Sequence, residues 1–142
     1  MNGAEASLLV VREWIVKAEN DLLNASHTLK LGRRCPTDTV CFHAQQCAEK
    51  YLKAYLVHRG KDFPKTHDLE ALAAGLRNGL KLVPDELARL KRYATVTRYP
   101  GAEPISLAEA GRAVSMARRV RKAVRAALPG PALRGRTTVR HR

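Results

Sequence analysis

Apolar residues recur every three or four positions through three long stretches of this 142-residue chain. This spacing places one face of an α-helix on an apolar core, whereas a half-buried strand would show strict alternation. Glycine and proline bound the stretches: Gly32 and Pro36 separate the first two, and Pro129 follows the last. The pattern therefore predicts long amphipathic helices joined by short loops.

Two shorter helices are expected between the long ones. The five predicted helices cover residues 5–31, 38–58, 66 or 67 to 78 or 79, 84 to about 97, and 107–128. The residues expected to cap three of them are Thr37 or Asp38, Thr66 or His67, and Ser106 with Glu109 in a capping box.

The predicted fold class is all-α, an up-and-down bundle of four to five antiparallel helices, because short connections place successive helices side by side. The bundle should occupy residues 5–128 as one domain. Residues 129–142 are basic and lack periodicity, which predicts a disordered tail.

The net charge of +13 is concentrated near the C-terminus. Residues 1–110 carry 16 Lys and Arg against 13 Asp and Glu, whereas residues 111–142 carry 10 basic residues and no acid. Such a segment can bind phosphate backbones or an acidic partner, although a solvated helix face and tail account for it equally well. No apolar run is long enough for a membrane span and no secretory signal opens the sequence, so we expect a cytoplasmic protein.

The three cysteines, Cys35, Cys41 and Cys47, predict small buried residues and no disulfide framework. His43 and Cys47 would share a helix face and could supply two metal ligands. Nothing nearby supplies a second pair, so we predict no metal and no cofactor.

Polar residues border two of the predicted core stripes. Asp21 lies between core positions of the first helix, and a buried carboxylate requires a partner. A polar band on the second helix comprises His43, Gln46, Glu49, Lys50 and Lys53. It could face a cleft, a partner subunit or Asp21, but Glu49 with Lys53 could also be a simple surface pair.

Two further polar clusters precede helices or loops. They are Lys65-Thr66-His67-Asp68 before the third helix, and Arg98-Tyr99 before a proline-rich loop. A helix N-terminus beside Lys and His can hold a phosphate, although the same residues would also serve as a cap.

Four ordered segments resemble the HEPN family. They are Trp14 with Ala18 and Asp21-Leu22, the segment from Cys41 to Ala54, the segment from Pro64 to Leu69, and Tyr93 through Arg98-Tyr99-Pro100. The resemblance covers residues 11–128. It implies a bundle of four or five helices that commonly dimerises and is often encoded beside a minimal nucleotidyltransferase as a toxin–antitoxin pair.

Many HEPN proteins are metal-independent ribonucleases with an R-x(4-6)-H motif placed across the dimer interface, and this sequence departs from that motif. Arg98 is followed at the required distances by Glu103, Pro104 and Ile105, none of which is histidine. His141 does follow arginines at matching distances, but in the predicted tail, where nothing would fix its position.

The leading hypothesis is a homodimer that works with a nucleotidyltransferase partner in a two-component system. It would bind nucleotide or RNA phosphates through Arg98, Lys50, Lys53, Lys65 and His67.

Two alternatives remain open. One is a metal-independent ribonuclease toxin with a non-standard acid/base set, Arg98 with His43 or His67. The other is a structural dimerisation module in which the polar band of the second helix secures the dimer. Independently of these alternatives, Asp21, Gln46, Glu49, Asp68 and Tyr99 are predicted to be structural polar residues. Tyr99 could also be modified by the partner, although packing within the bundle is the simpler expectation.

Overall fold

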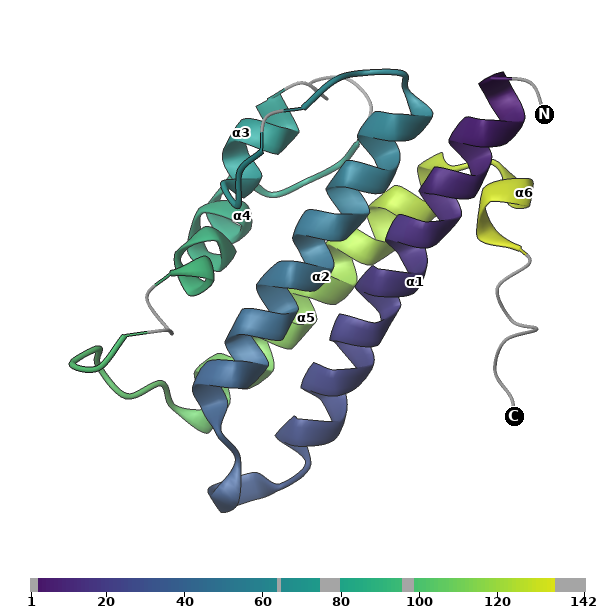
Figure 1. Cartoon of the computed structure of the whole chain (residues 1–142). Helices are drawn as coiled ribbons and strands as arrows, with labels where there is room; N and C mark the ends of the chain where they lie inside the picture. The colour runs from purple at the N-terminus through teal and green to yellow at the C-terminus, as the bar shows by residue number, and fades with distance from the viewer. Residues whose placement is uncertain (1–2, 64, 75–79, 96–98, 135–142) are drawn as a thin grey trace.

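The bundle is built on three long helices. The computed structural model describes residues 3–63, 65–74, 80–95 and 99–134. The long helices are α1 (Gly3–Leu29), α2 (Thr37–His58) and α5 (Leu107–Ala127). α2 contacts both α1 and α5 (Figure 1), and no strand occurs in the described residues. The predicted all-α class is confirmed.

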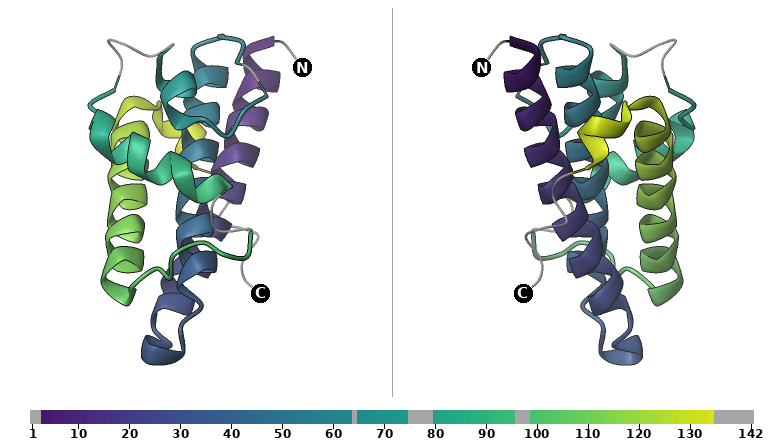
Figure 2. Two further views of the ribbon diagram at one scale, coloured as in Figure 1. Left: turned by 90° about the vertical axis from the view of Figure 1, so that its left-hand side faces the viewer. Right: turned by 90° about the vertical axis from the view of Figure 1, so that its right-hand side faces the viewer.

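The short elements between α2 and α5 cover one side of this core. α1 descends in Figure 1 and α2 returns beside it after the 3₁₀ turn Gly32–Arg34. The short helices α3 (Leu69–Ala74) and α4 (Pro84–Lys91), followed by the 3₁₀ turn Arg92–Ala94, lie against α2 before α5 ascends (Figures 1 and 2). α2 and α5 therefore run in the same direction, antiparallel to α1.

Small side chains allow the long helices to approach closely. The fully buried alanines of the long helices are Ala18, Ala25, Ala44, Ala48, Ala54, Ala110, Ala113 and Ala117. The larger side chains of Tyr51 and Leu52 on α2 are fully buried as well, as expected for a closely packed core. The apolar residues of α2 that the helical spacing predicts to face the core are the ones that the structure buries.

Several predicted helix ends are confirmed. Gly32 and Gly60 adopt φ of 63° and 67°, the left-handed region in which glycine ends a helix without steric cost. Ser106 caps α5 by accepting the backbone N–H of Glu109 at 3.0 Å. The first residues of α2 are different: the Thr37 hydroxyl donates to the Ile105 carbonyl at 2.7 Å, so it joins the start of α2 to the segment before α5 instead of capping α2.

The third helix begins later, and the fourth ends earlier, than the sequence predicts. Asp68, not Thr66 or His67, precedes α3, and its carboxylate accepts two backbone N–H groups of α3 at 3.0 and 3.2 Å. α4 ends at Lys91 instead of extending to about residue 97. The predicted end of α3, at Asn78 or Gly79, lies outside the described residues.

The beginning of the predicted tail is helical instead of disordered. α6 (Gly130–Leu133) packs against α1, with Ala132 only 2% exposed. Arg12 fixes this turn by donating two hydrogen bonds, of 2.9 and 2.7 Å, to the Pro131 carbonyl. Proline is favoured in a first helical turn, and Pro131 is the second residue of α6. His141 lies outside the described residues.

Candidate functional site

Asp21 of α1 is buried against the polar band of α2. Its side chain is 10% exposed, and its two oxygens are 2.8 Å from His43 Nδ1 and 2.6 Å from Lys50 Nζ. Seven residues separate His43 from Lys50, almost two helical turns, so both side chains project toward the same carboxylate. The polar band of α2 therefore supplies the partners that the buried Asp21 carboxylate requires.

Glu49 forms a second buried centre on the same face. Its side chain is 4% exposed and accepts hydrogen bonds from Lys53 Nζ at 3.0 Å and Gln45 Nε2 at 2.9 Å, while His67 Nδ1 lies 2.8 Å away. Burial raises the pKa of Glu49, but the hydrogen bonds from Gln45, His67 and Lys53 outweigh burial, and the net pKa is lowered. The simple surface pair of Glu49 and Lys53 is thus excluded.

Gln45 holds the segment before α3 on this face. It is fully buried, and its amide donates to the backbone carbonyl of His67 at 3.2 Å as well as to Glu49. Gln46 donates in turn to the Gln45 carbonyl oxygen at 2.7 Å. The sequence prediction missed Gln45, although a glutamine between core positions of a helix is itself a sign of a buried polar contact.

The two carboxylates orient two histidines in the same way. A ring nitrogen beside an ionised carboxylate carries the proton, so Nδ1 of His43 and of His67 donates and Nε2 is left for another partner. The His43 and His67 side chains are 29% and 54% exposed, and neither Nε2 has a hydrogen-bond partner in the described part of the chain. This surface, which we call the α2 polar face, comprises Asp21, His43, Gln45, Gln46, Glu49, Lys50, Lys53 and His67.

Aromatic rings border the face at Lys53. Its ammonium lies 5.3 Å from the centre of the Trp14 ring and 5.6 Å from that of Phe63. The two rings contact each other edge to face at 6.3 Å. Lys53 is therefore held by a carboxylate and by two π faces, which limits its freedom to follow a ligand.

The other predicted site residues do not join this face. Lys65 is exposed, Asp68 caps α3, and Arg98 lies outside the described residues. Tyr99 is 66% exposed, so the expectation that it packs within the bundle is wrong. The structure therefore brings together His43, Lys50, Lys53 and His67 but not the second cluster as a whole.

A second polar network, which the sequence prediction missed, joins the three long helices. The Tyr51 hydroxyl donates to Glu19, and Arg121 donates to both Glu19 oxygens at 2.7 and 3.2 Å. Arg125 donates to the Tyr51 hydroxyl at 3.3 Å. Burial raises the pKa of Glu19, but hydrogen bonds from Arg121 and Tyr51 and the nearby arginine charges lower it overall.

Most other cations of α5 remain without a carboxylate partner in the described residues. Arg112, Arg118 and Lys122 are exposed, and of these only Arg118 has a hydrogen-bond partner there, the Ser26 hydroxyl at 2.8 Å. Within the described ranges, the ion pairs of this helix are those of Arg119 with Glu86 and of Arg121 with Glu19. The positive charge concentrated in this part of the sequence therefore reaches the surface of the bundle.

The described residues show no arrangement for a metal centre. Within them, no group of three or more His, Cys, Asp or Glu side chains is placed to hold a metal ion. Cys41 and Cys47 are buried free thiols, and burial raises the pKa of Cys41 to about 12. None of the described helices is long and apolar enough to cross a membrane.

The protein is an all-α helical bundle whose second helix carries a polar face anchored by two buried carboxylates. Comparison of the sequence with known protein families identifies the family to which it belongs. The HEPN domain matches residues 11–127, and the chain therefore belongs to the HEPN family. No curated protein matches it.

Two solved structures support the assignment. TT1696 from Thermus thermophilus is 30% identical, with a TM-score of 0.71 over 83% of this chain and 98% of that one. ST0689, an archaeal HEPN homologue, is 27% identical, with a TM-score of 0.65 over 82% of this chain and 95% of that one.

Proposed function

We propose that this HEPN protein binds the phosphate groups of RNA or of a nucleotide on the α2 polar face. The observation that carries the proposal is the pair of histidines, His43 and His67, each oriented through Nδ1 by a buried carboxylate. In the imidazolium form each Nε2 also carries a proton, so these N–H groups and the remaining N–H donors of Lys50 and Lys53 can donate to phosphate oxygens.

The charge of the face suits a ligand that carries its own negative charge. Asp21 and Glu49 neutralise Lys50 and Lys53, so the face has no net charge while both histidines are neutral. Each histidine that becomes protonated adds one positive charge. A phosphate bound at Nε2 favours that protonation, because an anion stabilises the imidazolium form.

We further propose that the protein is a cytoplasmic homodimer that works with a minimal nucleotidyltransferase in a two-component system. The outer surface of α1 supports dimerisation, since Leu9, Val10 and Leu23 are 43%, 40% and 58% exposed. Light scattering should give about twice the chain mass of 15.7 kDa, and Leu23→Glu should shift it toward the monomer. A monomeric wild-type protein throughout a dilution series would reject the dimer.

Binding of a fluorescein-labelled single-stranded RNA, followed by anisotropy, tests the phosphate site. His67→Gln should weaken binding about tenfold, because one charge-assisted hydrogen bond to phosphate contributes roughly 1.4 kcal/mol. His27→Gln is the matched control, since His27 is an exposed histidine of α1 outside the face. Equal affinity of the wild-type protein and the His67→Gln and His43→Gln variants would refute the proposal.

A second candidate, a metal-independent ribonuclease, is favoured by the same carboxylate–histidine pairs. A histidine oriented by a carboxylate is the usual arrangement for a general base or acid, which contributes roughly 100-fold to 10,000-fold to a rate. In this case repurified protein would cleave RNA in EDTA, and His67→Gln or His43→Gln would abolish cleavage. Binding without cleavage supports the binding function alone.

A further inference from the structure

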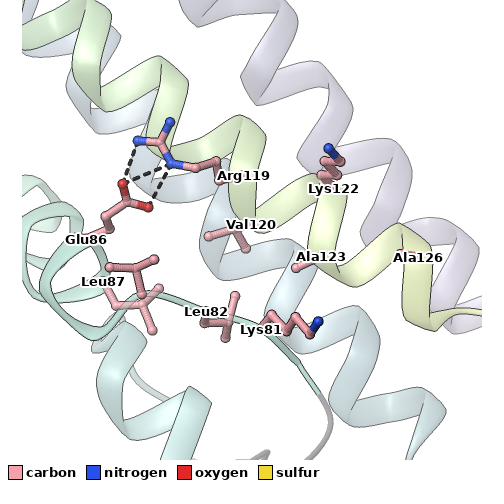
Figure 3. Close-up of a pocket in the computed structure, with 10 residues that line it drawn as sticks. Lys81, Leu82, Glu86, Leu87, Arg119, Val120, Lys122, Ala123 and Ala126 are labelled. Atoms are coloured by element: carbon pink, nitrogen blue, oxygen red, sulfur yellow. Dashed lines mark hydrogen bonds and ion pairs between the residues drawn. The ribbon is translucent and has the colours of Figure 1, made fainter.

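A groove lies between α5 and the segment that leads into α4 (Figure 3). It has a volume of about 360 Å³ and shares no residue with the α2 polar face. Its apolar lining comprises Leu82, Val83, Leu87, Val120, Ala123 and Ala126. Val83 is 50% exposed at its edge, so apolar surface there is open to a partner.

Cations border this apolar floor. Lys81 and Lys122 line the groove from opposite walls, and both are exposed with no ion-pair partner in the described part of the chain. The acid of the groove, Glu86, is neutralised by Arg119, whose Nε lies 2.9 Å from each of its oxygens (Figure 3). The groove therefore combines an apolar floor with a net charge of two positive units from its lysines.

We propose that this groove docks an acidic amphipathic helix of a partner protein. Apolar side chains of that helix would contact Val120, Ala123 and Ala126, and its flanking carboxylates would pair with Lys81 and Lys122. The lining of α5 extends from residue 119 to residue 126, about 10 Å at 1.5 Å per residue. That length accommodates anchors at positions i, i+3 or i+4, and i+7 of a docked helix.

Other occupants fit the groove less well. Residues 134–142 of this chain carry four arginines and no acid, so the lysines would repel them. The contact proposed for a second copy is the exposed apolar surface of α1, which lies outside the groove. RNA would find no aromatic side chain in the lining on which a base could stack. An acidic helix satisfies both the charge and the apolar floor.

The probe is a synthetic helical peptide with leucine at i, i+3, i+4 and i+7 and glutamate at the flanking positions, labelled with fluorescein. Its affinity for the full chain is measured by anisotropy. The double variant Lys81→Glu/Lys122→Glu should weaken binding at least tenfold, and Ala126→Trp should abolish it by filling the groove. Arg112→Glu, an exposed cation of α5 outside the groove, should change affinity less than twofold.

Circular dichroism of each variant separates loss of docking from loss of fold, since Ala126, Lys81 and Lys122 are all exposed. Equal binding of a peptide with lysine in place of glutamate, or an equal effect of Arg112→Glu, would overturn the proposal. So would self-association that disappears in Ala126→Trp, or displacement of the peptide by single-stranded RNA from the same groove. Retained RNA binding in Ala126→Trp would separate this site from the α2 polar face.

Discussion

The lysines of α2 and the basic residues of α5 have the same charge but different surroundings. Lys50 and Lys53 are only 22% and 12% exposed, and each pairs with a buried carboxylate. Arg112 and Lys122 of α5 are exposed and have no carboxylate partner in the described residues. A count of lysines and arginines along the sequence therefore overestimates the positive charge at the surface of α2, where carboxylates neutralise the lysines. At α5 the same count correctly indicates a positively charged surface.

This difference separates two ways of binding a polyanion. A buried carboxylate fixes the cations and histidines of α2, so their geometry can select a phosphate group. Exposed cations of α5 move freely and act mainly by displacing counterions, which favours any polyanion. We therefore expect substitutions on α2 to change stability and selectivity, and substitutions on α5 to change salt dependence.

The largest expected effect is on stability. Glu49→Ala should lower the free energy of unfolding by about 3 kcal/mol, because it removes the carboxylate that pairs with Lys53, whose side chain is only 12% exposed, and that accepts from the buried Gln45. Glu86→Ala, which breaks an exposed pair with Arg119, should cost about 1 kcal/mol or less. Urea denaturation followed by circular dichroism measures both.

Equal costs for these two variants would show that burial does not distinguish the two helices. The conservative variant Glu49→Gln keeps the shape and one acceptor, so it should be less destabilised than Glu49→Ala. A Glu49→Gln protein as unstable as Glu49→Ala would indicate that the charge itself is essential.

The second effect is on the stability of the folded chain at low pH. The pKa values of Glu49 and Glu19 are lowered in the folded chain from 4.5, so both contribute stability above that pH. This stability should be lost as pH falls through the lowered values, because the unfolded chain takes up protons first. Glu49→Gln should flatten the acid limb of a plot of unfolding free energy against pH, and an unchanged slope would contradict the ionised state of Glu49.

The third effect is on salt dependence. Replacing Arg112 and Arg118 with glutamine should reduce the slope of log affinity against log salt by about 1.4 for single-stranded RNA, at roughly 0.7 per phosphate contact. His67→Gln should weaken binding of both RNA and a mononucleotide but change this slope by less than about 1. If the α5 variant instead weakened mononucleotide binding as strongly as RNA binding, the division between the two surfaces would be wrong.

The smallest effect tests α6. A chain ending at Leu128 should lose about 1 to 2 kcal/mol relative to one ending at Arg134, because it exposes the surface covered by Ala132 and removes the partner of Arg12. Thermal unfolding of the two truncated chains provides the comparison. Identical midpoints would show that the turn adds nothing to the bundle.

Helical periodicity is sufficient to predict the bundle, because each long helix has a continuous apolar stripe. The same periodicity places Asp21 at the edge of its stripe, and this predicts that it needs a partner. The contact of Glu49 with His67 could not be predicted, since it depends on how the segment after Gly60 folds back onto α2. Gln45 was overlooked because its buried hydrogen bonds involve that same segment.

The neutralisation of Lys50 and Lys53 by carboxylates could not be predicted from the sequence either. Lys50 depends on a carboxylate 29 residues away on another helix, and no local pattern reports that distance. The short helix α6 was missed because Pro129-Gly130-Pro131 has the composition of a helix end, whereas its helical turn depends on packing against α1. Local signals thus identified elements, whereas contacts between elements determined the site.

The most direct measurement is a long-range ¹H–¹⁵N NMR spectrum of the imidazole rings during titration with single-stranded RNA. We expect the Nε2 resonances of His43 and His67 to shift together with one dissociation constant, while those of the exposed His27 and His58 remain in place. Before RNA is added, the Nδ1 resonances of His43 and His67 should be those of a protonated nitrogen that donates a hydrogen bond to a carboxylate. Shifts absent from His43 and His67 at saturating RNA would contradict phosphate binding at the α2 polar face.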